Sequence, residues 1–225
     1  MTTMDYAKAR ALMVEQQVRP WDVLDPRILD VLSALPREAF IAETHRKLAY
    51  ADLALPLPHG EAMMKPVLEG RTLQSLGLEP GDTVLEVGTG SGFLSACLGR
   101  LAREVVSLER HGDMADTARA RLAEQGIGNV RVEHADAFAW RTERRFSAVC
   151  VTGAVAEIPA QFMQWLQPGG RMFIVRGRSP AMEGLIVHAA DGNDCNDVNA
   201  ARIQSLFETD LPYLAGAAPA PTFEF

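Results

Sequence analysis

The chain has 225 residues, of which 48% are hydrophobic and 23% are charged, and its 22 Lys and Arg against 29 Asp and Glu give a formal net charge of −7. This composition is typical of a globular protein and excludes a disordered chain. The longest stretch without a charged residue, Val87 to Gly99, has 13 residues, whereas a membrane-spanning helix needs roughly 20 apolar ones. We therefore expect no membrane association, and the N-terminus has no apolar run of the kind found in secretory signals.

The charge distribution indicates which partners the protein can bind, and the cysteines indicate the redox state of its compartment. Residues 178–225 contain 2 basic and 7 acidic residues, and no basic stripe runs along the chain. Nucleic acid is therefore not an expected partner. Cys97, Cys150 and Cys195 lie far apart and show no paired spacing. They predict free thiols in a reducing cytoplasm, with neither a disulfide framework nor a metal site.

The first 79 residues read as a helical cap. Residues 6–18 have apolar side chains at a helical period. Asp25 as N-cap and Pro26 at the first helical position begin a second helix that runs to about Leu35. Residues 38–50 are expected to form short helical pieces, and residues 53–58 are extended because prolines restrict them. Residues 66–78 predict a third helix.

From residue 80 the pattern alternates between short β-branched runs and helical stretches. The expected strands are residues 82–87, 104–109, 130–134, 146–152 and 171–175, and the expected helices are residues 92–103, 111–125, 136–144 and 159–166. Alternation of this kind predicts an α/β protein with a doubly wound, mostly parallel Rossmann-like sheet, whose strands are nearly continuous apolar runs because helices cover both faces.

Two further strands are expected after the core, at residues 184–190 and 200–207. A turn-rich segment joins them, so they predict a late antiparallel hairpin at one sheet edge. We expect a single domain over residues 1–225, with a helical region at 1–79, a core at 80–177 and C-terminal strands and tail at 178–225.

A glycine-rich turn, residues 88–92, follows the first core strand directly and opens a helix; we call it the glycine loop. Glycines let a ligand approach the backbone at the carboxyl end of the strand. The dinucleotide fingerprint requires a third glycine where this chain has Phe93. Glu86 places a carboxylate beside the loop, which disfavours a pyrophosphate and suits a cation. Glu109 ends the second core strand, where an acid can accept hydrogen bonds from a ribose.

A ligand with a ribose, an adenine, a positive centre and no phosphate is S-adenosylmethionine. Asp136 follows the third strand, where a carboxylate can accept a hydrogen bond from the adenine amino group. The alternative is that the glycines merely turn the chain. The residues expected to bind the cofactor are Glu86, Gly88, Thr89, Gly90, Ser91, Gly92, Glu109, Arg110, Asp136, Ala137 and Thr152.

Residues 85–93 resemble motif I of class I methyltransferases, most closely that of the protein-L-isoaspartate O-methyltransferases. Other segments agree with the same family, namely residues 13–19, 35–40, 49–52, 151–154, 157–159 and 166–171. The resemblance covers roughly residues 10–177. It implies an enzyme that transfers a methyl group from S-adenosylmethionine to a carboxylate of damaged, isoaspartyl-containing proteins.

Residues 61–66, here called the acceptor segment, depart from that family. Family members carry Gln-Thr-Ile-Ser-Gln-Pro there, with hydroxyls beside the acceptor carboxylate. This chain has Ala62 in place of the threonine and Met64 in place of the serine. His59 and Lys65 are the remaining polar candidates near the acceptor, each with the alternative of an ordinary surface role. Met64 could line an apolar acceptor pocket or simply pack in the core.

Three functions stay open at this point, and no catalytic residue is assigned beyond the candidates His59, Met64 and Lys65. The first is isoaspartyl methyl transfer to a protein or peptide. The second is methyl transfer to another acceptor, including a small molecule, which the loss of both hydroxyls favours. The third is a protein that binds S-adenosylmethionine without turnover. The oligomeric state does not follow from the sequence.

Overall fold

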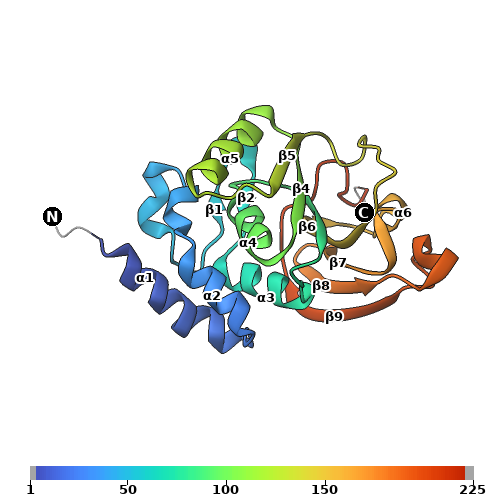
Figure 1. Ribbon diagram of the computed structural model, residues 1–225, viewed down its shortest axis with the longest axis horizontal. Coiled ribbons are helices and arrows are strands. Elements are labelled where there is room, and N and C mark those ends of the chain that lie inside the picture. The colour runs from blue at the N-terminus through green and yellow to red at the C-terminus, as the bar shows by residue number, and fades with distance from the viewer. Residues whose placement is uncertain (1–3, 221–225) are drawn as a thin grey trace, which may run out of the picture. The chain divides into compact units, whose positions relative to one another are not determined.

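The computed structural model describes residues 4–220, and Figure 1 labels their helices and strands. Residues 1–3 and 221–225, the two ends of the expected helical region and tail, lie outside the described residues. The chain divides into two compact units, one ending at Trp140 and the other beginning at Arg141. The boundaries expected after residues 79 and 177 stay a prediction.

Three helices form the N-terminal part of the first unit: α1 (Tyr6–Met13), which continues as a π-helical turn, α2 (Pro26–Ala34) and α3 (Pro66–Leu76). Figure 1 shows them in blue to cyan. The Asp25 carboxylate accepts a hydrogen bond of 2.9 Å from the amide of Arg27, which caps α2 as predicted. Gly77, at φ 51°, ends α3. The expected helices and their signals are confirmed.

Short 3-10 turns over Arg37–Phe40 and Glu43–Leu48 connect α2 to a small hairpin. This hairpin consists of β1 (Leu55–Pro56) and β2 (Ala62–Met63), which pair in antiparallel fashion. The connection is tied to α1 and its π-helical extension, because Arg10 Nε donates to the hydroxyl of Tyr50 at 3.1 Å and Gln17 Nε2 donates to its carbonyl at 3.1 Å. The N-terminal helices therefore hold the chain that leads into the acceptor segment.

The sheet of the first unit consists of β3 (Thr83–Val87), β4 (Glu104–Glu109) and β5 (Val130–His134). The strands are parallel, in the order β5-β4-β3. Helix α4 (Phe93–Leu101) connects β3 to β4, and α5 (Gly112–Glu124) connects β4 to β5. Every residue of β3 is buried, as expected for a parallel strand covered on both faces.

The second unit contains β6 (Phe146–Val155), the short α6 (Ala160–Met163), β7 (Leu166–Arg178), β8 (Ala181–His188) and β9 (Arg202–Thr209). Its strand order is β6-β7-β8-β9. The β6–β7 pair is parallel, whereas β8 and β9 are antiparallel to their neighbours. The late antiparallel hairpin predicted from the sequence is therefore present.

Two sequence expectations were wrong, and the helix expected at residues 159–166 is limited to Ala160–Met163. Residues 136–144 form a turn at 137–139 and otherwise irregular chain in place of a helix, because the Asp136 carboxylate accepts a hydrogen bond from the amide of Phe138 at 2.9 Å and Thr142 accepts one from the amide of Arg144 at 3.0 Å. Such local bonds compete with helical ones. Strand β7 begins at Leu166, five residues before the expected start, because a bulge accommodates Pro168 within the ladder.

Within residues 4–220, no helix is long and apolar enough to cross a membrane. The three cysteines are free and buried, which confirms the prediction of free thiols.

Candidate active site

The glycine loop connects β3 to α4 and contains three glycines in the left-handed region, Gly88, Gly90 and Gly92, with φ of 94°, 54° and 86°. Only glycine adopts such angles without strain. A Cβ added to Gly92 would lie 3.2 Å from Cβ of Ala118 in α5. The loop therefore needs glycine both for its turn and for the close approach of α5. Its other two residues, Thr89 and Ser91, are buried.

Glu109, at the end of β4, lies against this loop. Its Oε2 accepts a hydrogen bond of 2.8 Å from the amide of Gly90, and its Oε1 accepts one of 3.0 Å from the amide of His111. A carboxylate has about four acceptor positions, so both oxygens keep capacity for hydroxyl donors. The structure thus brings together the loop and the acid that the sequence pairs with a ribose.

Glu86 lies deeper than expected, because its side chain is fully buried beneath the loop. Its Oε2 accepts hydrogen bonds from the hydroxyls of Ser95 in α4 and Ser107 in β4. Ser107 in turn shares a hydrogen bond with Thr89 of the loop. Within residues 4–220, Oε1 of Glu86 is buried without a hydrogen-bond partner. Burial raises the pKa of Glu86 to about 7.

Arg110, Asp136 and Ala137 lie at the carboxyl ends of β4 and β5. The register pairs Glu109 with His134, so the residues after both strands emerge at one edge of the parallel sheet, where such folds bind ligands. Arg110 and Asp136 are exposed and Ala137 is half-buried. Thr152, the remaining predicted cofactor residue, is half-buried in β6 of the second unit. Contact of these residues with a cofactor stays a prediction.

The β1–β2 hairpin, whose second strand belongs to the acceptor segment, contacts the glycine loop and the start of α5. A Cβ added to Gly90 would lie 3.3 Å from Cδ1 of Leu57. His59, at φ 62°, places Nε2 2.9 Å from Oδ1 of Asp113 and stacks its ring on that of His111 with centroids 4.1 Å apart. His111 is paired with Glu61 at 3.5 Å. The hydrogen bond from His59 lowers the pKa of Asp113.

The candidate acceptor residues occupy different environments. The ring nitrogen Nε2 of His59 is already engaged with Asp113. Met63 and Met64 are buried, which agrees with core packing. Lys65 is half-buried and precedes α3 as its N-cap residue. Ala62 is half-buried and has no polar side-chain atom to offer.

Several side chains that shape this site were not singled out from the sequence. Arg121 of α5 donates from Nη1 to the carbonyl of Ser91 at 3.1 Å, and burial lowers its pKa. Ser95 and Ser107 donate to Glu86. Arg37 donates from Nη2 to the carbonyl of Met64 at 2.7 Å. Arg37 alone had a sequence signal, because it belongs to one of the segments that resemble the family.

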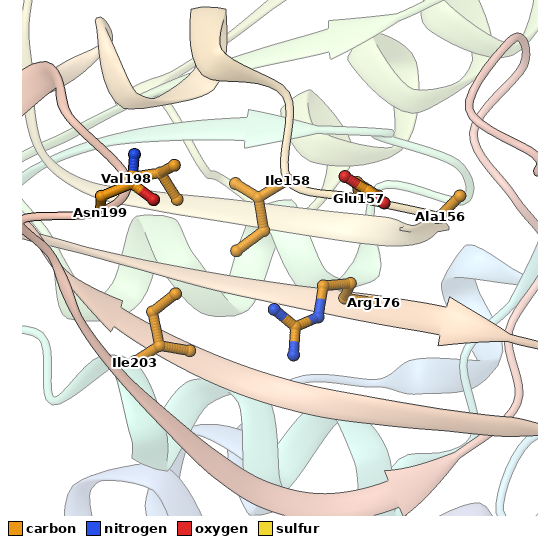
Figure 2. Close-up of a pocket in the computed structure, with 7 residues that line it drawn as sticks. All are labelled: Ala156, Glu157, Ile158, Arg176, Val198, Asn199 and Ile203. Carbon is orange, nitrogen blue, oxygen red and sulfur yellow. The ribbon is translucent and has the colours of Figure 1, made fainter.

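A separate pocket of about 390 Å³ lies within the second unit. Its lining residues are Ala156, Glu157, Ile158, Arg176, Val198, Asn199 and Ile203. Figure 2 shows the guanidinium of Arg176 beside Ile158 and Ile203. The lining contains one cation, Arg176, and one carboxylate, Glu157, and Arg176 also pairs with Glu183 at 3.7 Å. Of the lining residues, Glu157 and Ile158 belong to a segment that resembles the family. Among the described residues, no group of three or more His, Cys, Asp or Glu is arranged to hold a metal ion.

The model of the protein-L-isoaspartate(D-aspartate) O-methyltransferase family matches residues 8–198. A protein-L-isoaspartate O-methyltransferase of Koribacter versatilis (strain Ellin345) is 37% identical over 183 residues, 81% of this chain and 82% of the relative. One from Methylorubrum extorquens (strain PA1) is 38% identical over 191 residues, 84% of this chain and 83% of the relative.

Solved structures share the fold. A Plasmodium falciparum protein assigned to the protein-L-isoaspartate O-methyltransferases, in complex with S-adenosyl-L-homocysteine, superposes with a TM-score of 0.75 at 19% identity, covering 91% of this chain and 97% of that one. A second protein-L-isoaspartate O-methyltransferase gives a TM-score of 0.78 at 21% identity, covering 94% of this chain and 66% of that one. These similarities confirm the predicted Rossmann-like methyltransferase fold.

Proposed function

The chain belongs to the protein-L-isoaspartate(D-aspartate) O-methyltransferase family, and from this we propose that it methylates a carboxylate of isoaspartyl residues in damaged proteins, with S-adenosylmethionine as methyl donor. The observation that carries this proposal is the family match over residues 8–198. The preserved glycine loop, with Glu109 bonded to Gly90, supports it.

The residues present fit S-adenosylmethionine. The loop bends through three glycines, has Phe93 where the dinucleotide fingerprint requires glycine, and lies above the carboxyl group of Glu86, which disfavours a pyrophosphate. The carboxylate of Glu109 retains acceptor capacity for ribose hydroxyls, and Asp136 offers an exposed carboxylate at the same sheet edge for the adenine. The carboxyl group of Glu86, whose buried Oε1 has no hydrogen-bond partner among residues 4–220, adds a negative potential beneath the loop when it is ionised. When bound, the donor supplies a sulfonium methyl group.

Methyl transfer to a carboxylate requires almost no proton transfer by the protein. A carboxylate acceptor is already ionised at neutral pH, so the site needs no general base. The protein must instead orient the acceptor for in-line attack and exclude water from two opposite charges. Of the candidate residues, Lys65 belongs to the acceptor segment and is half-buried, whereas His59 is bonded to Asp113. We assign the electrostatic attraction of the acceptor to Lys65.

A second candidate function follows from the acceptor segment. Ala62 and Met64 replace both hydroxyls, and Met64 is 7% exposed. A site with these side chains also suits a smaller or more apolar carboxylic acid. The two candidates differ in acceptor only and share donor, fold and transfer chemistry.

We also assign the enzyme to the cytoplasm, without a nucleic-acid partner. Three buried free thiols support a reducing compartment. The net charge of −7 opposes association with a phosphate backbone.

The two candidates are separated by offering S-adenosylmethionine with a labelled methyl group together with three acceptors. These are a protein aged to accumulate isoaspartate, the same protein freshly prepared, and a set of small aliphatic carboxylic acids. The proposal predicts that label enters the aged protein and not the fresh one. Label in the small acids alone would support the second candidate, and label in none of them would contradict both.

A further inference from the structure

Arg37 is a fully buried arginine whose guanidinium is bonded on every side. Its Nε donates to the carbonyl of Ala49 at 2.9 Å, its Nη2 donates to the carbonyl of Met64 at 2.7 Å, and its Nη1 pairs with the carboxylate of Glu69. Both charged side chains are almost completely buried, with side-chain exposures of 1% and 2%. Burial raises the pKa of Glu69, while Arg37 opposes that rise.

The partners of Arg37 belong to two different parts of the proposed site. Met64 belongs to the acceptor segment, at the position where the family has serine. The guanidinium carbon also lies 4.9 Å from the centroid of the Phe93 ring. Phe93 is the first residue of α4 and directly follows the glycine loop, and its ring is held edge-on by Phe40 at 5.5 Å. One rigid side chain therefore spans from the acceptor segment to the end of the glycine loop.

We propose that Arg37 is a positioning residue, which fixes the distance between the acceptor segment and the glycine loop, with Glu69 as its counter-charge. This inference rests on the proposed methyl transfer. Catalysis by orientation is sensitive to this distance, since a displacement of about 1 Å can lower a rate about 100-fold. Arg37 touches neither acceptor nor donor in this account and acts through the backbone of Met64.

The stability of the folded protein does not by itself explain why a buried arginine occupies position 37. Replacing a buried ion pair with apolar residues of similar size is often neutral or stabilising. What apolar residues cannot replace is the fork of donors that grips two separate backbone carbonyls. Lysine would keep the charge for Glu69, but its single ammonium lacks the planar fork and stacks less well on a ring.

The test compares three variants with the wild-type protein. Arg37→Lys keeps the charge and loses the fork. Arg37→Met with Glu69→Leu removes both charges, so no lone charge is left buried if the first variant folds poorly. Ile186→Ala, in the buried face of β8, is the control for a general loss of stability.

Two readouts are needed. The first is hydrogen exchange of the amides in residues 55–65, measured without any ligand, with the amides of β4 as internal reference. The second is single-turnover methyl transfer to an isoaspartyl peptide with saturating S-adenosylmethionine, alongside calorimetric binding of S-adenosylhomocysteine.

For both Arg37 variants we expect exchange in residues 55–65 to rise at least about tenfold relative to β4, and the transfer rate to fall about 10- to 100-fold. Affinity for S-adenosylhomocysteine should change less than about threefold. Ile186→Ala should change none of these at a temperature where it is folded. Unchanged exchange in residues 55–65, or a double variant with the wild-type transfer rate, would overturn the inference. Absence of transfer by the wild-type protein would instead refute the proposed function, while the exchange measurement still decides whether Arg37 holds the segment.

Discussion

Glu86 shows what burial does to a single carboxyl group. Its folded pKa of about 7 lies above the ordinary 4.5, because the ionised form loses its hydration and only two hydroxyls replace it. The folded state therefore binds this proton more tightly than the unfolded state does. The stabilising contribution is complete below about pH 4.5 and is lost as the pH rises through about 7.

We accordingly expect Glu86→Gln to remove this pH dependence. Relative to the wild-type protein, the free energy of unfolding of the variant should rise between pH 4.5 and pH 8, by at most about 3 kcal/mol. Urea denaturation at a series of pH values measures the difference, in which the other carboxyl groups cancel. A difference that stays constant over this range would contradict the assigned burial.

The types of the site residues could be predicted from the sequence, but their contacts could not. Glu109 was expected beside the loop because strand ends of a parallel sheet share an edge. Glu86 was expected at the ligand, whereas the fold places it under the loop with Ser95 and Ser107. The pairing of Arg37 with Glu69 joins residues 32 positions apart. No local pattern predicts a contact of this kind, since it depends on how α3 packs against the preceding turns.

Strands between helices were the most predictable elements. Both β4, which is buried along nearly its whole length, and β5, in which only Val132 is buried, have the bounds expected from the sequence, because a short β-branched segment between two helices has few alternatives. Residues 136–144 were misassigned because their polar side chains bond their own backbone. Strand β7 was shortened in the prediction because proline and two glycines interrupt its apolar pattern.

A single glycine, Gly184, gives a testable prediction for the packing between β8 and β9. A Cβ on Gly184 of β8 would lie 2.6 Å from the ring of Phe207, its partner across the pair. Gly184→Ala should therefore lower the free energy of unfolding by about 1–3 kcal/mol, because the ring must shift. Gly128→Ala is the matched control, since within residues 4–220 no atom beyond its two chain neighbours lies within 4 Å of the added Cβ. It should be neutral or stabilising by up to about 1 kcal/mol. Equal effects in urea denaturation would refute this reading.

At the scale of an element, we also predict the effect of restoring the two missing hydroxyls of the acceptor segment. If hydroxyls strengthen the hold on the acceptor carboxylate, Ala62→Thr with Met64→Ser should raise kcat/KM for an isoaspartyl peptide about 10- to 100-fold, because hydrogen bonds to charged groups contribute about 1.5–3 kcal/mol. The double variant Ala62→Val with Met64→Ala has nearly the same shape and lacks the hydroxyls. If both double variants gave the same kcat/KM, the hydroxyls would not be the cause.

For the whole molecule, the net charge of −7 predicts a preference among peptide acceptors. An isoaspartyl peptide flanked by lysines should show a lower KM than one flanked by glutamates, because the field of the protein attracts the first and repels the second. The difference should shrink as salt rises, since the screening length falls to about 3 Å at 1 M. Steady-state kinetics at low and high salt measures this, and a difference that does not depend on salt would argue for specific contacts.

The central claim is that the chain methylates isoaspartyl carboxylates although its acceptor segment lacks both family hydroxyls. It is tested most directly with two synthetic peptides of the same sequence, one containing isoaspartate and the other aspartate. Both are incubated with the wild-type protein and S-adenosylmethionine, and methyl ester formation is followed by mass spectrometry. The account predicts ester on the isoaspartyl peptide only. Binding of S-adenosylmethionine without ester on either peptide would contradict it.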